Sequence, residues 1–212
     1  MRDANNEPLS TDEEEAHVTP RHAASLIVLR DRAAGPEILM GLRGAGHRFM
    51  PNVLVFPGGA VDADDMAAPV GTALRPDTRA HLAKAADERL VHAIGVAAAR
   101  ELEEETGLTL GNPADLHGLH FLCRMVTPPP SPVRFNARFL VVDYDLISGT
   151  LVGSGELEGL RYIGVEEALG LKVALPTRQV LNHLRPYLAM SHAERDERKA
   201  TPVFVRRRWG TE

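Results

Sequence analysis

Short apolar runs alternate with polar and glycine- or proline-rich stretches along most of the chain. Runs of four to ten apolar residues bounded by turn residues predict strands. The predicted strands are 23–30, 37–43, 53–56, 119–127, 134–143 and 160–164, and the last of these is expected to end the sheet. Strands that lie on both sides of helices along the chain favour a mixed α/β layered fold.

The clearest helix is predicted over residues 88–106. Its buried face consists of apolar residues that recur at helical spacing, namely Val91, Ile94, Ala98 and Leu102. Gly107 follows as a C-terminal stop. Shorter helices are predicted from Pro76, over 166–169, and from Pro176 to about Leu184. The charged segment beyond residue 190 has no assignment.

The length of 212 residues accommodates one globular domain with a proper core. Residues 1–20 are polar and acidic, which predicts a disordered N-terminal tail and leaves 21–212 as a single domain. Within that domain, residues 66–87 are alanine-rich and contain two prolines. This segment is interpreted as an insertion.

Charge and composition exclude several classes of protein. The net charge of -5 argues against a nucleic-acid partner, since such binders are usually basic. No apolar run is long enough to predict a membrane span, and the N-terminus has no apolar signal core, so a cytoplasmic location without a membrane partner is expected. Cys123, the single cysteine, lies in an apolar run and is expected to be buried rather than nucleophilic.

Four glutamates crowd the end of the predicted helix, where the helix dipole is negative and carboxylates repel one another. Glu101 and Glu105 stand at i and i+4, which costs ~0.2–0.5 kcal/mol. Together with Glu104 they fall within an arc of roughly 100° beside the buried face, whereas Glu103 points elsewhere. A solvated charged face explains Glu103 well and the other three poorly. We hypothesise that the three carboxylates bind Mg²⁺ or Mn²⁺, which bridges phosphate oxygens and activates a water.

The sequence RELEEETGL (100–108) resembles the second half of the Nudix box, R-E-U-x-E-E-x-G-U, in which U is apolar, and every fixed position matches. The first half is G-x5-E, and Gly59 with Asp65 resembles it, with aspartate in place of glutamate. The box has eight residues from this acid to the arginine, whereas here the step to Arg100 is 35 residues. The longer step agrees with the interpretation of 66–87 as an insertion. The chain is thus similar to Nudix hydrolases, and in particular to the coenzyme A diphosphatase-like subgroup with an insertion inside the box.

This resemblance implies a Nudix α/β/α sandwich with a mixed β-sheet and a helical insertion. It implies that Glu101, Glu104 and Glu105 bind the divalent metal, helped by the backbone carbonyl of Gly58. Arg100 would hold a glutamate in place by charge-assisted hydrogen bonds, so these four charged side chains are the expected catalytic residues. The alternatives are an ordinary surface ion pair for Arg100 and an ordinary turn for Gly58 and Gly59.

The stretch 39–59 resembles the motif of coenzyme A-hydrolysing Nudix enzymes, L-L-T-x-R-[SA]-x3-R-x3-G-x3-F-P-G-G. Arg43, Arg48 and Phe56 fall in place and are the expected substrate-binding residues. The departures are Gly41, Gly44 and Asn52, which replace threonine, serine or alanine, and glycine. The two arginines would clamp phosphate groups, including the 3′-phosphate of coenzyme A. The alternative is a pair of surface arginines beside an edge strand.

Two loops are further candidates. Glu156 lies in a glycine-rich loop, where related enzymes often supply an extra carboxylate; Glu156 or Glu158 would be a metal ligand, a general base or a solvated acid. The proline-rich loop 128–132 is either a cover over the substrate or a rigid connector. No metal-ligand spacing is found among four of the histidines, namely His47, His92, His117 and His120.

The function expected from these features is metal-dependent hydrolysis of the diphosphate linkage in a small nucleotide. The favoured substrate is coenzyme A or acyl-coenzyme A, giving 3′,5′-ADP and 4′-phosphopantetheine. ADP-ribose, NADH or a dinucleoside polyphosphate is the alternative, because such enzymes change substrate through their loops. A non-catalytic Nudix-fold sensor is the second class. The insertion would cover the site or build a homodimer contact, and the sequence does not decide between these.

Overall fold

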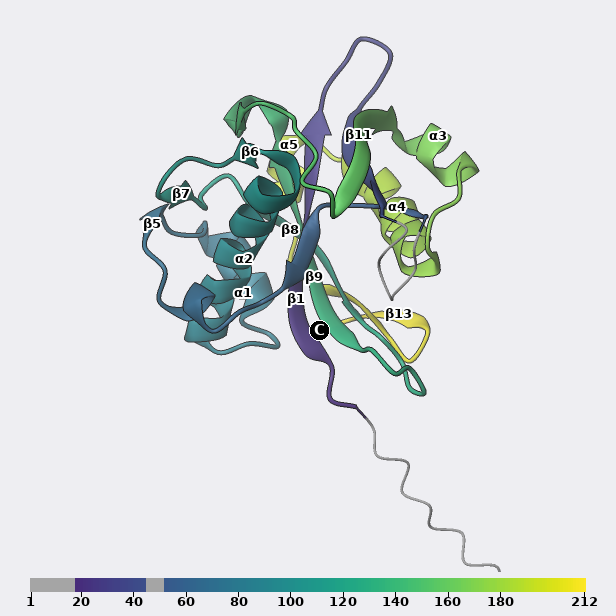
Figure 1. The fold of residues 1–212 in the computed structure, drawn as a ribbon. Helices are drawn as coiled ribbons and strands as arrows, with labels where there is room; N and C mark the ends of the chain where they lie inside the picture. The colour runs from purple at the N-terminus through teal and green to yellow at the C-terminus, as the bar shows by residue number, and fades with distance from the viewer. Residues whose placement is uncertain (1–17, 45–51) are drawn as a thin grey trace, which may run out of the picture.

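The computed structural model describes residues 18–44 and 52–212. Within them, a mixed nine-stranded sheet has the order β11-β2-β1-β9-β8-β12-β13, with β3 beside β2 and β4 beside β1 (Figure 1). Its strands are β1 (Arg21–Arg30), β2 (Glu37–Arg43), β3 (Leu54–Val55), β4 (Gly58–Ala60), β8 (His120–Val126), β9 (Phe135–Asp143), β11 (Leu157–Gly164), β12 (Pro202–Val205) and β13 (Arg208–Thr211). Two short pairs join β5 (Val70–Thr72) to β7 (Ala114–Asp115) and β6 (Leu108–Thr109) to β10 (Ser148–Gly149).

Helices cover both faces of this sheet, as the α/β expectation requires (Figure 1). They are α1 (Pro76–Leu82), α2 (Glu88–Thr106), α3 (Val165–Gly170), α4 (Leu175–Leu188) and α5 (His192–Asp196), with 3-10 turns η1 (Asp64–Met66) and η2 (Tyr144–Leu146). The α2 face of the sheet carries one apolar cluster and the α4 face another. The fold is therefore the layered sandwich that the sequence predicts.

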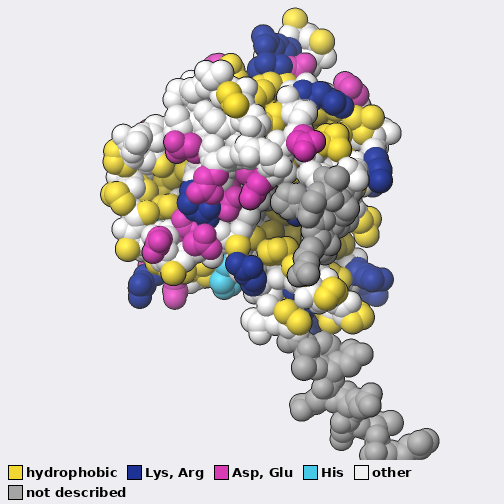
Figure 2. Space-filling view, viewed as in Figure 1, with side chains coloured by type: hydrophobic (Ala, Val, Ile, Leu, Met, Phe, Trp, Pro, Cys, Tyr) yellow, Lys and Arg dark blue, Asp and Glu magenta, His cyan; other side chains and the backbone are white. Residues whose placement is uncertain are grey.

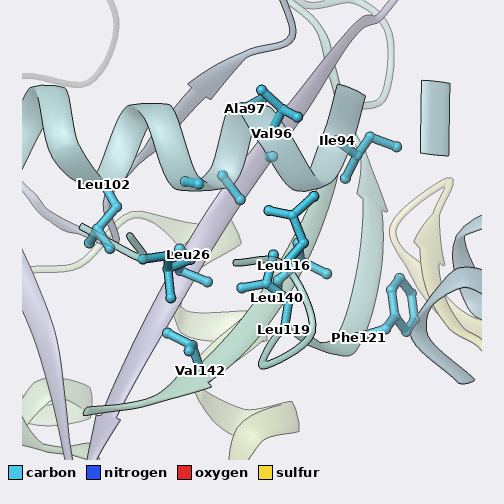
Figure 3. Close-up of a cluster of buried hydrophobic side chains, with 14 of the residues drawn as sticks. Leu26, Ile94, Val96, Ala97, Leu102, Leu116, Leu119, Phe121, Leu140 and Val142 are labelled. Carbon is cyan, nitrogen blue, oxygen red and sulfur yellow. The ribbon is translucent and has the colours of Figure 1, made fainter. Parts of the chain in front are cut away.

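Helix α2 packs across the sheet through the apolar face that its periodicity predicts. Ile94 and Leu102 are fully buried and lie over Leu26 of β1 and Leu140 of β9 (Figure 3). Asp87 caps the N-terminus by accepting a hydrogen bond from the Leu90 backbone N–H. The helix ends at Gly107, whose φ of 71° is the left-handed conformation expected of a C-terminal stop. These contacts hold the glutamates of its last turns at a defined place beside the sheet.

Strand β1 lies in the middle of the sheet and orders its neighbours. It runs parallel to β9 from Arg21 to Leu29 and antiparallel to β4 through Ala23, Ala24 and Ser25. Strand β2 joins β1 only near the end of β1, at Leu29 and Arg30. On that side of β1, the first half of the strand pairs with β4 and its last residues pair with β2. The sheet therefore divides beside Gly58.

Most of the predicted elements are confirmed, but the expectation that 160–164 is the last strand is wrong. Strands β12 and β13 follow it and extend the sheet beyond β8. Residues of β13 are exposed, so this edge strand lacks the apolar alternation from which strands are predicted. Helix α4 also continues four residues past Leu184, and β4 was not predicted because it consists of Gly58, Gly59 and Ala60.

The segment 66–87 packs against the α2 side of the sheet and against the C-terminal part of the chain. In α1, the Thr78 hydroxyl donates to the Leu119 carbonyl at 2.8 Å. The buried His81 ring lies 2.8 Å from the Thr201 hydroxyl and stacks on Phe121. Through these contacts the segment 66–87 packs against other parts of the same chain.

Two features of composition have structural counterparts. Cys123 is fully buried in β8, and burial raises the pKa of its thiol, as expected for a core residue rather than a nucleophile. Across 18–44 and 52–212, none of the helices has both the length and the apolar character needed to cross a membrane.

Candidate metal and substrate site

The free edge of β4 is the centre of the candidate site. Pro57 and Val61 form hydrogen bonds with β1, through Leu26 N–H to Pro57 O and Val61 N–H to His22 O. Since successive residues of a strand alternate in direction, the backbone groups of Gly58 and Ala60 point to the opposite edge. Helix α2 lies on that edge. The backbone carbonyl of Gly58, an expected metal ligand, therefore faces the glutamates of the helix.

Arg100 connects the two segments that resemble the halves of the Nudix box. Its guanidinium donates to both carboxylate oxygens of Asp65, at 3.0 and 3.1 Å, and to the carbonyl of Ala60 at 3.0 Å. Asp65 is only 2% exposed and also accepts from the Asp62 backbone N–H. The hydrogen bonds to Asp65 raise the pKa of Arg100 further above its ordinary value, so the guanidinium stays charged. This arrangement is buried on the Asp65 side and differs from a surface ion pair.

The same guanidinium also holds two of the candidate metal ligands. Nη1 of Arg100 donates to Glu101 Oε1 and to Glu104 Oε2, each at 2.9 Å. Glu101 is mostly buried, whereas Glu104 is exposed. Burial raises the pKa of Glu101, and the charge of Arg100 opposes that rise. Arg100 thus relieves part of the repulsion between the two carboxylates.

Glu105 is the most deeply buried of the three glutamates. It is 6% exposed, and its Oε2 accepts a hydrogen bond from the Gly58 N–H at 2.8 Å. Burial raises the pKa of Glu105 to about 8, and the negative charges of Glu101 and Glu156 add to the rise. Glu103 is exposed on another side of the helix. The structure therefore separates Glu103 from the other three, as the helical arc predicts.

Two glycines make this close packing feasible. Gly58 has φ of +149°, which side chains with a Cβ rarely adopt, and a Cβ there would lie 2.6 Å from the Ser25 hydroxyl oxygen. A Cβ on Gly59 would collide with the carboxylate of Glu101. These positions are therefore more constrained than an ordinary turn, because the backbone passes directly beneath the carboxylate.

Two of the expected substrate-binding residues, Arg43 and Glu156, lie within electrostatic reach of Glu105. Both act electrostatically on Glu105, Arg43 by lowering its pKa and Glu156 by raising it. Glu156 also acts on Glu101. Glu158 instead lies beside Gly44, since its Oε1 is 3.7 Å from where a Gly44 Cβ would stand. The structure thus brings Glu156, rather than Glu158, into the electrostatic environment of the box glutamates.

The other two expected substrate-binding residues have different outcomes. Phe56 is 4% exposed and packs edge to face against Phe139, with ring centroids 6.3 Å apart. Its observed contacts are those of a core residue. Arg48 lies outside the described residues, as does His47.

The donor set fits a hard divalent cation. Carboxylate and carbonyl oxygens are the ligands that Mg²⁺ and Mn²⁺ prefer, and ionisation of the buried Glu105 is otherwise disfavoured. The carboxylates of Glu101, Glu104 and Glu105 do not converge on one point in this structure. Arg100 donates hydrogen bonds to the first two, and the Gly58 N–H donates to the third. Figure 2 shows acidic side chains gathered around a basic one on this face of the molecule.

A second group of potential ligand atoms lies elsewhere, at α1, β8 and α5. The ligand atoms of Asp77, His120 and Asp196 lie within 4.8 Å of one another, a grouping that sequence spacing did not indicate. The guanidinium of Arg75 contacts all three, at 2.6 Å from Asp77, 2.8 Å from Asp196 and 2.9 Å from the His120 ring. An internal cation already neutralises these acids, so we interpret the group as an ion-pair network.

Comparisons with known proteins bear on the fold and the family of this chain. No family model matches the sequence. A nudix hydrolase 7 of Caenorhabditis elegans is 29% identical over an alignment 195 residues long, and the match covers 76% of this chain. The chain spans 58% of the length of that curated relative.

Solved structures extend the comparison to the fold. A NUDIX hydrolase from Alicyclobacillus acidocaldarius superposes with a TM-score of 0.62 at 25% identity, covering 82% of this chain and 98% of that one. The NUDIX domain of Shewanella oneidensis NrtR, solved with ADP ribose, superposes with a TM-score of 0.50 at 14% identity, covering 85% and 96%. The second likeness concerns the fold alone. The chain has the Nudix fold, and its similarity in sequence and structure supports a relationship to the Nudix hydrolase family.

Proposed function

We propose that this protein is a Mg²⁺- or Mn²⁺-dependent hydrolase that cleaves the diphosphate linkage of a nucleoside diphosphate derivative. The observation that carries the proposal is the free edge of β4, where Gly58 faces Glu101 and Glu105 while Arg100 is anchored by Asp65. A buried carboxylate whose pKa is raised, beside a second carboxylate, is costly unless a cation compensates it.

Each residue of this edge has a role in the proposal. Glu101, Glu104 and Glu105 would hold the ions together with the Gly58 carbonyl. When bound, the metal supplies a polarised water and neutralises the charge that develops on the diphosphate. Arg100 fixes the orientation of Glu101 and Glu104 through its shared Nη1.

Arg43 and Glu156 would complete the site. The guanidinium of Arg43 would pair with phosphate oxygens, which it suits by charge and by its planar donors. Glu156 acts electrostatically on Glu101 and Glu105, which supports a role for it as the group that would accept the proton of the attacking water. Arg48 is proposed as the second phosphate contact on the strength of its sequence motif alone.

The favoured substrate is coenzyme A or acyl-coenzyme A, because the stretch 39–59 keeps the spacing of the coenzyme A motif. The expected products are 3′,5′-ADP and 4′-phosphopantetheine or its acyl form. ADP-ribose, NADH and dinucleoside polyphosphates form the alternative class. The related NrtR domain was solved with ADP ribose, which makes this compound a suitable comparison in an assay.

The experiment is a product assay. Purified protein is incubated with Mg²⁺ or Mn²⁺ and coenzyme A, acetyl-coenzyme A, ADP-ribose, NADH or a diadenosine polyphosphate, and the products are separated by chromatography. Formation of 3′,5′-ADP from coenzyme A, abolished by EDTA, is the expected result. Preference for ADP-ribose would keep the chemistry and reject the coenzyme A assignment. Absence of turnover on every compound would contradict the enzyme proposal.

A further inference from the structure

Ser25 is an exception in the central strand of the sheet. Residues 23–29 of β1 are buried at every position except Ser25, which is partly exposed and is also the one polar residue among them. On its face of the strand the neighbours are Ala23 and Ile27, which are buried. A partly exposed residue in the middle of a central strand means that solvent reaches the sheet at this point.

This opening lies beside the candidate metal site. Ser25 pairs with Gly58 on one side and with Phe139 on the other. Its hydroxyl oxygen would lie 2.6 Å from a Cβ placed on Gly58. With standard bond lengths, the hydroxyl is then within about 6 Å of the Gly58 nitrogen. That nitrogen is 2.8 Å from Glu105 Oε2, so one bound group can reach both the carboxylate edge and the hydroxyl.

The surroundings of the hydroxyl make its chemistry distinctive. Phe56 and Phe139 line the same face of the sheet and are buried. Among the described residues, the Ser25 hydroxyl has no side-chain or backbone hydrogen-bond partner. A hydroxyl that neither packs as an apolar group nor pairs with a residue of 18–44 or 52–212 is available to a ligand, and a hydroxyl can donate to an anionic oxygen.

We propose that the Ser25 hydroxyl binds substrate by donating a hydrogen bond to an oxygen of the diphosphate group held at the β4 edge. The inference rests on the proposed function and adds a contact on the side of Gly58 that faces away from α2. Arg43 contributes charge, whereas Ser25 contributes a fixed direction, because a β-strand side chain in the middle of a sheet has little freedom. Ser25 is in this sense a substrate-positioning contact rather than a metal ligand.

The test compares Ser25→Ala with Ser25→Thr, which retains a hydroxyl, and with Ser148→Ala, an exposed serine of β10. Initial rates are measured with Mg²⁺, and binding of ADP-ribose and coenzyme A is measured by calorimetry with Ca²⁺. For Ser25→Ala we expect KM and Kd to rise about tenfold for both nucleotides, with kcat within about twofold of the original. Ser25→Thr should restore most of the affinity, and Ser148→Ala should behave like the unmodified protein.

Several outcomes would overturn the inference. Affinities of Ser25→Ala equal to those of the unmodified protein would do so, as would a loss of affinity for one nucleotide only, which indicates a contact to the sugar or base. A smaller Mg²⁺-induced rise in melting temperature would show a disturbed metal edge instead. Nucleotide binding without hydrolysis would contradict the proposed function alone, because the Kd comparison still decides on Ser25. Failure of the unmodified protein to bind either nucleotide would reject both.

Discussion

Arg100 and Asp65 are 35 residues apart in the chain and form a two-pronged ion pair, with nitrogen–oxygen distances of 3.0 and 3.1 Å. The segment 66–87 leaves the sheet after Asp65, and the chain returns at α2. The two segments that resemble the halves of the Nudix box therefore meet in space, although 35 residues separate Asp65 from Arg100. The shorter aspartate still reaches the arginine because η1 brings its backbone close.

Removal of the Asp65 carboxylate should destabilise the protein. Asp65→Ala leaves Arg100 without its buried partner, and we expect the free energy of unfolding to fall by about 3 kcal/mol. Chemical denaturation measures this change. Asp64→Ala is the matched control, because Asp64 is adjacent but exposed and should change stability by less than about 0.5 kcal/mol. Equal effects of the two variants would contradict the structural role of Asp65.

Glu104→Gln should remove most of the turnover while the fold persists. Glu104 is exposed, and its partner is Arg100, which keeps its bonds to Asp65 in the variant. We expect at least a hundredfold lower kcat, since a neutral amide is a poorer ligand for a hard cation. Glu103→Gln changes a neighbouring exposed carboxylate outside the proposed site and should keep normal rates. Near-normal turnover by Glu104→Gln would reject its assignment as a metal ligand.

The stability of the metal-free protein should fall as the pH rises. The pKa of Glu105 is about 8 in the folded protein, against 4.5 for an unperturbed glutamate. Between these values the unfolded chain releases a proton that the folded protein retains, so the contribution of Glu105 to stability is fully present below about pH 4.5 and is lost as the pH rises to about 8. The loss attributable to Glu105 has an upper bound of about 5 kcal/mol. Denaturation midpoints in EDTA, measured across this range, give the slope.

Two comparisons assign that slope to Glu105. Glu105→Gln should flatten it and raise stability at pH 8 without metal, since the buried group can no longer ionise. Saturating Mg²⁺ should have a similar effect in the original protein, because a bound cation favours the ionised carboxylate. An unchanged slope in Glu105→Gln would assign the pH dependence to other groups.

Gly58→Ala should be one of the most damaging glycine substitutions. The φ of +149° is strained for alanine, and the added Cβ would press against Ser25. We expect a loss of about 2–3 kcal/mol of stability, together with lower activity. Gly170→Ala has no atom within 4 Å of the added Cβ and an ordinary backbone, so it should be neutral or slightly stabilising. Melting temperatures of the two variants test the difference.

The elements that sequence alone determined are those with strong local signals. The strand at β1, the helix at α2 and its end at Gly107 follow from apolar periodicity and from the conformational freedom of glycine. The grouping of Glu101, Glu104 and Glu105, with Glu103 apart, follows from helical geometry. Strand β13 could not be predicted in this way, because an exposed edge strand is held by its pairing with β12 and by the stacking of Trp209 on His183.

Only the tertiary structure decided which distant residues share the site. Asp65 and Arg100 meet because η1 packs beside α2, and Arg43 comes close to Glu156 because β2 pairs with β11, where Arg43 lies opposite Leu157. The exposure of Ser25 likewise depends on the division of the sheet between β4 and β2. Sequence periodicity is a local property of three or four residues, whereas these contacts depend on how whole strands and helices pack, which no short pattern encodes.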